Sequence, residues 1–352
     1  MAITEILLET RIGERLSVAF SGDTPLAIFH ESDWIPRGLR LGTSHEVILR
    51  ERPAGLDGAF CETESGASVF VRLGKAKAPP TGARLRVEIV CEARKSKAAR
   101  GRVRAEADET SPATAFEAWK AHIAPGATIT FAEGAEDWAR IDGALETALL
   151  SKVTLPGGGR LSVARTPALT AFDIDTAGRP MRGPRGEAAT SLNIEAAKEM
   201  ARQMALRGLG GLAVLDCVAP VPKPSGGDIK AAFLAAFRDL SPRKAAALAP
   251  SPFGLMEVSL AWAETPIDEV LGNGEGGFSP AGEALRGLRL LERRVKTAPC
   301  VSAGLALPKA AYMAADERPG GIAAIEALYG MQLGPRVLLE INPDGRTEVT
   351  CS

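Results

Sequence analysis

Two aspartates stand out in this chain, because each closes an apolar stretch of the kind that forms a buried strand. Residues 168–178 read ALTAFDIDTAG and place Asp173 after the apolar run, and residues 210–220 read GGLAVLDCVAP and do the same for Asp216. Residues 192–206 between them have the composition of a helix. Strand, helix and strand in that order predict a right-handed crossover with two parallel strands in one sheet. Both aspartates are then expected at the carboxyl ends of those strands, where open α/β sheets bind ligands.

Metal binding is the chemistry expected of this pair. Neighbouring strands lie about 4.8 Å apart, so the two carboxylates repel each other unless a cation lies between them. Hard oxygen ligands suit Mg²⁺. Asp175 is expected on the same face of its strand as Asp173. The alternative interpretation is that these acids cap helices or lie in solvent, but clustering buried acids without a counter-charge is costly, which favours the metal.

A second group of residues is typical of nucleic-acid binding. Five short strand-like runs suggest a small barrel such as an OB-fold, at 45–52, 57–62, 67–73, 83–91 and 99–104. Basic residues crowd one strand–turn–strand part of it: Arg94, Lys95, Lys97, Arg100, Arg102 and Arg104. Phe60 and Phe70 lie on its strands, and OB-folds hold single strands by phosphate contacts and aromatic stacking. The alternative is a solvated basic edge with two core phenylalanines.

Composition places the chain among ordinary globular proteins. Its 352 residues suffice for two or three domains, with 45% apolar residues, 24% charged residues and a net charge of −1. This balance gives no hint of nucleic acid, so any such signal must be local. The N-terminus does not resemble a signal peptide and no apolar run approaches membrane-spanning length. A cytoplasmic protein without a membrane partner is expected.

Three further patterns argue against other chemistries. The five cysteines, at 61, 91, 217, 300 and 351, form no CxxC pair and are expected to be reduced thiols without a zinc ribbon. The three histidines have neither metal spacing nor a nearby nucleophile signature, which argues against a histidine-based hydrolase. Residues 272–277 fit GxGxxG, but they open directly onto no helix, so we expect a flexible linker and no dinucleotide site.

Several longer stretches resemble the bacterial ribonuclease E/G family. Residues 155–163 (LPGGGRLSV) and 168–175 resemble the entry to its catalytic domain, as do residues 193–216 (NIEAAKEMARQMALRGLGGLAVLD) and 253–259 (FGLMEVS). The long central block is highly specific.

The upstream part of the chain carries a weaker likeness to the same family. Residues 53–63 (PAGLDGAFCET) are similar to the opening of its OB-type RNA-binding domain, and residues 96–100 (SKAAR) resemble the basic turn near its end. The resemblance covers nearly the whole chain and is strongest from 150 to 260.

The fold class that follows is mixed α/β. The expected parts are a reduced ribonuclease-H-like subdomain (1–36 and 107–150), an inserted OB-fold RNA-binding domain (37–106), a DNase-I-like catalytic domain (151–263), a linker (264–280) and a small α/β domain (281–352).

The activity that the resemblance implies is Mg²⁺-dependent endonucleolytic cleavage of single-stranded RNA, in RNA processing or decay, rRNA processing included. It implies that Asp173 and Asp216 hold the catalytic metal, which activates a water for attack on the phosphodiester. Asp175 stands where well-studied members have an asparagine that orients the second aspartate, and it joins the other two as a candidate catalytic residue.

The resemblance also assigns RNA contacts in the barrel. The family's RNA-contacting aromatics match Phe60 and Phe70, and a basic contact matches Lys97. Arg100, from the same basic strip, completes the candidate RNA-binding set.

The chain departs from the family pattern in three places. Only about forty residues separate Glu106 from the helix around Glu146, so the family's 5′-monophosphate sensor domain is missing. The two-cysteine zinc link is absent from 265–277, so no zinc and no zinc-bridged dimer are expected, although another homo-oligomer is possible. Leu260 and Trp262 replace basic residues that usually follow the MEVS motif, which weakens the expected grip on phosphate.

Two other functions remain open. The first is a non-catalytic RNA-binding protein or RNA chaperone on the same scaffold, which the changes at Leu260 and Trp262 favour and the retained aspartates oppose. The second is a metal-dependent phosphoesterase acting on small molecules, which explains the aspartates but leaves the basic strip unexplained.

Overall fold

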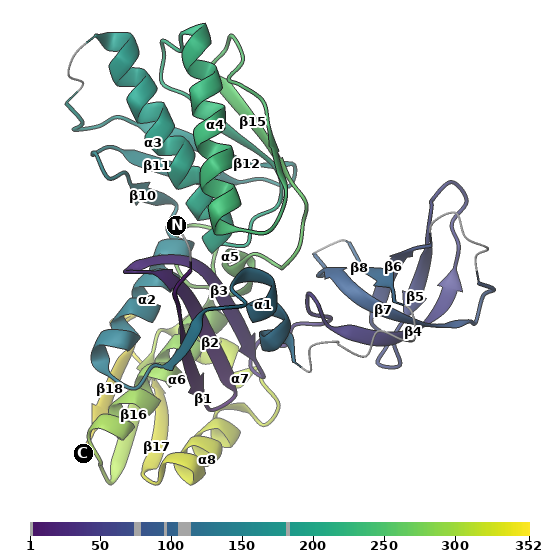
Figure 1. Ribbon diagram of the computed structural model, residues 1–352. Helices are drawn as coiled ribbons and strands as arrows, with labels where there is room; N and C mark the ends of the chain where they lie inside the picture. The colour runs from purple at the N-terminus through teal and green to yellow at the C-terminus, as the bar shows by residue number, and fades with distance from the viewer. Residues whose placement is uncertain (1–2, 74–78, 95–96, 105–113, 181–183) are drawn as a thin grey trace.

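The computed structural model describes residues 3–73, 79–94, 97–104, 114–180 and 184–352. In these ranges the chain is mixed α/β, with three sheets and one closed five-stranded barrel, which confirms the expected fold class. The barrel stands to one side of the body that the sheets and helices form (Figure 1). None of the helices in the described ranges has both the length and the apolar character needed to cross a lipid bilayer.

The N-terminal sheet has four strands in the order β3-β2-β1-β9. Its strands are β1 (Glu5–Arg11), β2 (Glu14–Ser21), β3 (Thr24–Ser32) and β9 (Thr128–Phe131), and its helices are α1 (Ala115–Ile123) and α2 (Ala135–Leu149). β1 pairs antiparallel with β2 but parallel with β9, which follows the barrel in the chain. The segments before and after the barrel therefore build one sheet.

The barrel closes in the order β4-β5-β6-β8-β7. Its strands are β4 (Ser44–Glu51), β5 (Ala59–Glu62), β6 (Ser68–Arg72), β7 (Arg84–Cys91) and β8 (Ala99–Val103). Alternate side chains fill its interior, among them Leu49, Val69 and Ile89, because successive residues of a strand point to opposite faces. The five predicted runs are confirmed as strands, and the closed barrel is consistent with an OB-type fold.

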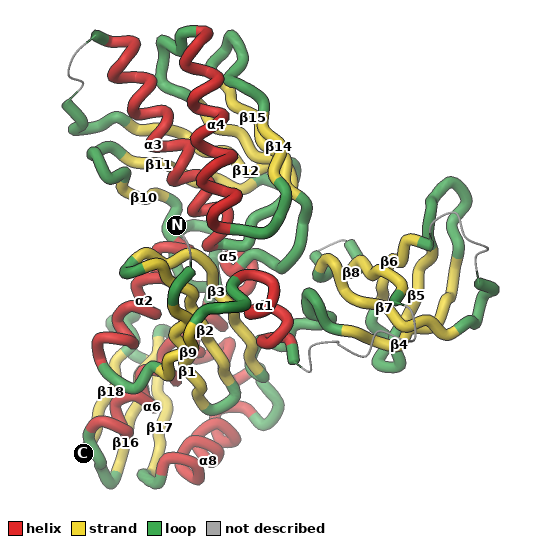
Figure 2. The backbone as a smooth tube through the Cα atoms, in the orientation of Figure 1, coloured by secondary structure: helices red, strands yellow, loops and turns green. Residues whose placement is uncertain are grey.

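The third structural unit is a six-stranded sheet in the order β10-β11-β12-β13-β15-β14. Its strands are β10 (Lys152–Thr154), β11 (Arg160–Arg165), β12 (Leu169–Asp175), β13 (Gly211–Asp216), β14 (Ala245–Ala247) and β15 (Leu255–Leu260). Its helices, α3 (Arg185–Leu206) and α4 (Lys223–Leu240), lie side by side and pack on one face of the sheet (Figure 2). β12 and β13 are adjacent and parallel, as predicted.

α3 begins seven residues before the predicted start at residue 192. Residues 185–191 read RGEAATS and hold good helix formers but few apolar side chains, so hydrophobic periodicity did not mark them.

The C-terminal unit is a three-stranded sheet in the order β17-β16-β18 with helices beside it. Its elements are α5 (Ile267–Val270), α6 (Pro280–Thr297), β16 (Ser302–Leu307), α7 (Lys309–Asp316), α8 (Gly321–Leu333), β17 (Arg336–Ile341) and β18 (Glu348–Cys351). Residues 264–280, predicted as a linker, contain the short helix α5. Ile267 and Leu271 are buried with α2 and α6, so both apolar side chains anchor the segment.

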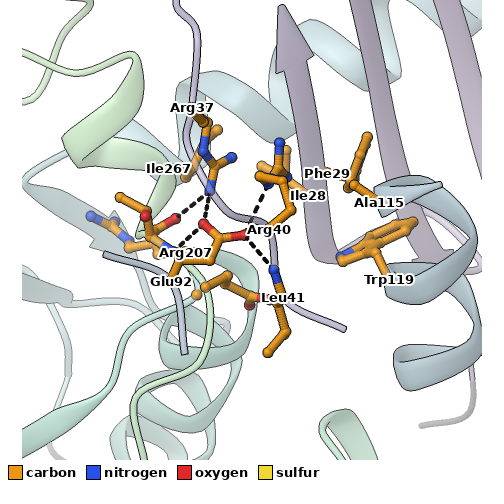
Figure 3. Close-up of a pocket in the computed structure, with 13 residues that line it drawn as sticks. Ile28, Phe29, Arg37, Arg40, Leu41, Glu92, Ala115, Trp119, Arg207 and Ile267 are labelled. Atoms are coloured by element: carbon orange, nitrogen blue, oxygen red, sulfur yellow. Dashed lines mark hydrogen bonds and ion pairs between the residues drawn. The ribbon is translucent and has the colours of Figure 1, made fainter. Parts of the chain in front are cut away.

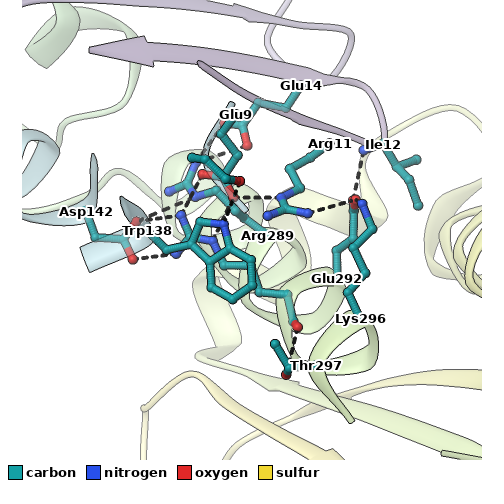
Figure 4. A network of polar contacts seen from close by, with 12 residues as sticks. Glu9, Arg11, Ile12, Glu14, Trp138, Asp142, Arg289, Glu292, Lys296 and Thr297 are labelled. Atoms are coloured by element: carbon teal, nitrogen blue, oxygen red, sulfur yellow. Dashed lines mark hydrogen bonds and ion pairs between the residues drawn. The ribbon is translucent and has the colours of Figure 1, made fainter. Parts of the chain in front are cut away.

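α6 docks on the N-terminal sheet through buried ion pairs (Figure 4). Arg293 donates to both oxygens of Glu9 at 2.7 and 2.6 Å and to Asp142 at 2.5 Å. Arg289 donates to both oxygens of Glu14 at 2.9 and 3.0 Å. Burial disfavours the charged form of Glu9, but the hydrogen bonds and charge of Arg293 lower its pKa below the ordinary value. The fork of Arg293 on Glu9 and the single nitrogen of Arg289 on Glu14 set how the C-terminal unit sits on β1 and β2.

Glu92, just after β7, joins the barrel to the two neighbouring units (Figure 3). Its carboxylate is 4% exposed and accepts from Arg37 at 2.5 Å and from Arg40 at 2.9 Å. The backbone N–H groups of Leu41 and Thr265 donate to it at 3.2 and 3.0 Å. Burial alone raises the pKa of this carboxyl, but the two arginines and the backbone donors lower it to about 2.

We predict that Glu92→Gln lowers the free energy of unfolding by about 3 kcal/mol at pH 7, since the variant leaves two buried guanidinium groups without their counter-charge. The pKa in the folded state lies below the ordinary value, so the contribution is present above about pH 4.5 and is lost as the pH falls toward about 2. Urea unfolding between pH 3 and pH 7 should show the difference from wild type shrinking in acid. Glu64→Gln, which neutralises an exposed carboxylate of the barrel, is the control. Equal effects of both variants would reject the assigned role of Glu92.

Candidate functional site

The structure brings Asp173 and Asp216 together. β12 and β13 pair in a register that sets Asp173 directly opposite Asp216 at the carboxyl end of the two strands. Side-by-side residues on parallel strands point to the same face of the sheet, about 4.8 Å apart. The two carboxylates therefore project together from the face that α3 and α4 leave uncovered.

This uncovered face carries a row of side chains through the aspartate pair. On one side, Ser162 of β11 lies opposite Asp173, and Lys152 of β10 lies opposite Ser162. On the other side, Leu255 of β15 lies opposite Asp216. The residues before and after these positions on each strand point into the core beneath the helices. The side chains of the row therefore face the open side of the sheet.

The environment of the two aspartates does not by itself require a cation at this site. Asp173 and Asp216 are both exposed, so the free-energy cost of clustering buried acids without a counter-charge does not apply to them. Within the described ranges, no group of three or more His, Cys, Asp or Glu side chains is placed to hold a metal ion. Two exposed carboxylates on one face still suit Mg²⁺, which keeps several waters and takes one or two protein carboxylates.

Asp175 has a local partner. Its Oδ1 accepts from the backbone N–H of Ala177 at 2.9 Å, the geometry of an Asx turn after a strand. It is half-buried on the same face as Asp173, and it pairs in register with Arg160 of β11. The carboxylate thus shapes the turn that follows β12.

Asn193, which no sequence pattern marked as a site residue, holds the backbone after β13. It is fully buried on α3, accepts from the N–H of Val218 at 2.8 Å and donates to the C=O of Val218 at 3.0 Å. This two-point contact fixes the chain just beyond Asp216. A polar residue on the apolar face of a predicted helix was the signal that could have found it.

Two more residues shape the surroundings of Asp216. Gly254 has φ +86°, and a Cβ there would lie 3.2 Å from the carbonyl oxygen of Cys217, so the turn before β15 favours glycine. Phe253, beside it, is 89% exposed. Burial and then the charge of Asp216 raise the pKa of the Cys217 thiol to about 12, which excludes this cysteine as a thiolate nucleophile at neutral pH.

Three predicted RNA-binding residues lie in one row on the outside of the barrel. Phe60 of β5 pairs with Phe70 of β6, and Phe70 pairs with Arg100 of β8. The two rings meet edge to face with centroids 5.3 Å apart, and both are half-buried while Arg100 is exposed. A Cβ on Gly58 would lie 2.6 Å from the Phe70 ring, so this glycine makes room for it. The row combines aromatic faces with a cation.

The fourth predicted residue, Lys97, lies apart from that row. It is exposed and pairs with Arg94 in a short β-bridge before β8. Two arginines of the basic strip already have an acidic partner. Arg102 and Arg104 both pair with Glu88, at 2.8 and 3.0 Å. Lys95 belongs to the same predicted strip but lies outside the described residues.

The two residues that replace basic positions have different environments. Leu260 is 3% exposed and belongs to the core beneath α3 and α4. Trp262 packs against Gly210 and Gly211, and the Arg94 guanidinium lies 3.9 Å from the centre of its ring. The guanidinium of Arg94, from the barrel, therefore contacts the face of the Trp262 indole.

The aspartate pair and the barrel do not meet in this arrangement. Arg94 and Lys97 line a cleft together with Leu169 and Leu212, at the amino ends of β12 and β13. The aspartates lie at the opposite, carboxyl ends of the same strands. The uncovered face of the sheet connects the two regions.

Comparison with known proteins supports the resemblance seen in the sequence. Residues 107–261 match the family described as Ribonuclease E/G family. Ribonuclease E of Haemophilus influenzae is 43% identical over 83 residues, which cover 24% of this chain and 9% of that protein. Ribonuclease E of Escherichia coli is also 43% identical over 83 residues, covering 24% of this chain and 8% of that protein. Ribonuclease G of Haemophilus influenzae is 36% identical over 78 residues, or 22% of this chain and 16% of that protein.

The matched segments span less than a fifth of the length of these relatives. The family match does, however, contain both strands of the aspartate pair, the helix between them and the Asn193 contact. By this match and these motifs, residues 107–261 are similar to the ribonuclease E/G family.

Proposed function

We propose that this protein is a Mg²⁺-dependent endoribonuclease that cleaves single-stranded RNA in RNA processing or decay. The observation that carries the proposal is the register of Asp173 opposite Asp216, inside the segment that matches the family. We propose with it that the six-stranded sheet is a DNase-I-like catalytic domain, the barrel an OB-type RNA-binding domain and the four-stranded sheet a reduced ribonuclease-H-like subdomain.

Asp173 and Asp216 are the residues that would hold the metal. A bound Mg²⁺ would supply an activated water and neutralise charge on the scissile phosphate. The protein's own contribution is positional. β12 and β13 fix the two carboxylates side by side, and Asn193 fixes the chain just after Asp216. Lys152 lies in the same row of the open face and adds a positive charge near the place where a phosphate would bind.

The barrel row would hold the RNA chain. Bases stack on aromatic rings regardless of sequence, and cations contact the phosphates, which suits Phe60, Phe70 and Arg100 in their single row. Lys97, which pairs with Arg94 in the β-bridge before β8, extends the cationic surface toward the sheet.

A non-catalytic RNA-binding protein is the second candidate. It is favoured by Trp262, whose indole occupies a position where a basic side chain is expected, and by Asp175, whose carboxylate is engaged in a turn. The first test below separates the two candidates, because it scores cleavage and binding in the same sample.

Asp173→Asn and Asp216→Asn should each reduce RNA cleavage by at least about a hundredfold, while RNA affinity changes by less than about twofold, because the carboxylates serve the reacting phosphate and not the bulk of the RNA. The measurement is cleavage of a labelled A/U-rich single strand with and without Mg²⁺, together with its binding. Asp228→Asn, which removes an exposed carboxylate from α4, is the matched control. Wild-type cleavage by either aspartate variant would refute the metal assignment, and binding without any cleavage by wild type would favour the second candidate.

RNA affinity should fall steeply with added salt, because cations that contact phosphates release condensed counterions. Lys97→Ala and Arg100→Ala should each lower the slope of log affinity against log salt by about one unit. Lys309→Ala, at an exposed position on α7, should leave the slope unchanged. The barrel is not the RNA site if affinity proves insensitive to salt.

Cleavage should be indifferent to the chemistry at the 5′ end of the RNA. A terminal phosphate needs a fork of donors such as arginine supplies, and the sequence holds no arginine between 105 and 139. Thr114 is engaged as the N-cap of α1, Lys120 offers a single ammonium, and Thr110 and Ser111 lie outside the described residues. One RNA should be compared with a monophosphate, a triphosphate and a hydroxyl at its 5′ end. A monophosphate advantage above about tenfold, or roughly 1.4 kcal/mol, would show that a sensor exists.

A further inference from the structure

A cleft of about 490 Å³ separates the barrel from the six-stranded sheet, and neither the aspartate pair nor the aromatic row of the barrel lies in it. One wall holds Arg94 and Lys97, which pair in a short β-bridge. The other wall is formed by the amino ends of β12 and β13, with Leu169 and Leu212. Trp262 lies between the two walls. The cleft is large enough for a nucleotide, since small-molecule sites typically start near 300 Å³.

Arg94 and Trp262 form a stacked platform in this cleft. The guanidinium carbon of Arg94 lies 3.9 Å from the centre of the Trp262 ring. The indole of Trp262 packs directly against two glycines, since a Cβ on Gly210 or Gly211 would lie only 2.8–3.0 Å from its ring atoms. The Nε atom of Arg94 is buried and has no hydrogen-bond partner among the described residues. The planar guanidinium of Arg94 is therefore held by its contact with the Trp262 ring and not by an ion pair with a carboxylate.

The charges in the cleft leave a positive excess. Asp268 and Glu269 are the acidic residues that line it, and both pair with Arg165. Arg94 and Lys97 line it, and neither forms an ion pair within the described part of the chain, although the charge of Glu269 also acts on Arg94. A cleft with unpaired cations and an aromatic floor suits a ligand that carries both negative charge and a flat ring.

We propose that this cleft binds one nucleotide of single-stranded RNA. Its base stacks on the free face of the Arg94 guanidinium, which Trp262 supports from behind, and its phosphate contacts Lys97. This inference rests on the proposed function, since it adds a binding subsite to the same RNA path. The next residues along that path are exposed Leu212 and half-buried Val214 on the open face. Leu212 and Asp216 are four residue steps apart along β13, or about 13 Å.

The test uses the full-length protein and a fluorescein-labelled A/U-rich RNA of about 12–16 nucleotides, the upper range for one OB-type domain. Binding is followed by anisotropy without divalent metal, so that the RNA stays intact. Arg94→Ala should weaken binding about tenfold, in keeping with one lost stacking contact. Arg94→Lys keeps the charge but has no plane, so it should also weaken binding several-fold while leaving the salt dependence of wild type.

Arg238→Ala is the matched control, because it removes an exposed arginine from α4 on the covered side of the sheet. A second readout keeps the test independent of any folding defect in the variants. Wild-type protein is irradiated with the same RNA carrying 4-thiouridine, and the cross-linked peptides are mapped by mass spectrometry. Cross-links on Trp262 or Arg94 are expected, in addition to those on the barrel row.

The outcomes separate this inference from the proposed function. If wild type binds RNA but Arg94→Ala behaves like Arg238→Ala, or cross-links fall on the barrel row of Phe60, Phe70 and Arg100 alone, the nucleotide subsite is refuted and the proposed function stands. If Arg94→Lys binds as tightly as wild type, charge and not stacking explains the cleft, and the stacked geometry is wrong. If wild type binds no RNA at all, the proposed function fails and this subsite fails with it.

Discussion

The position of the barrel depends on one buried carboxylate. Glu92 belongs to the barrel, Arg37 and Arg40 belong to the chain that leads into it, and Thr265 belongs to the segment that leaves the six-stranded sheet. The backbone N–H of Glu92 also donates to Ala263 at 2.7 Å. A charged group so deeply buried is tolerated only with its partners in place, so the three segments must assemble together. The cleft beside Trp262 exists because this junction holds the barrel near the sheet.

The six-stranded sheet is asymmetric, and its asymmetry serves the candidate site. Alternate residues of β12 and β13 point under α3 and α4, where Phe172 and Leu215 are buried, and the residues between them face solvent. Asp173 and Asp216 fall on the open side. An exposed pair of carboxylates can exchange waters and approach a long polymer, which a buried pair could not do. The same exposure means that electrostatic strain alone does not demand a metal there.

α6 shows a different use of charge. Its arginines reach Glu9 and Glu14 on strands that lie about 280 residues earlier in the chain, and these contacts are almost fully buried. Desolvation offsets much of the attraction in such buried pairs, but removing one partner would leave an uncompensated buried charge. The C-terminal unit thereby holds the N-terminal sheet, which in turn carries the chain into the barrel and the Glu92 junction.

The sequence by itself determined the local elements and the main candidate residues. Strand-like runs marked the five strands of the barrel, and the strand–helix–strand order placed Asp173 beside Asp216, because these features depend on periodicity and on short crossovers. Family likeness marked Phe60 and Phe70, and the run of basic residues marked Arg100, but only strand pairing set the three in one row.

Tertiary structure alone decided which faces are open and which distant groups meet. The exposure of the aspartates depends on which face the helices cover, and the Asn193 contact depends on how α3 meets the turn after β13. The Arg94–Trp262 stack joins residues 168 positions apart. Residue patterns report each segment's own conformation, but contacts between distant segments arise only when the whole chain has packed, so no local signal foretold them.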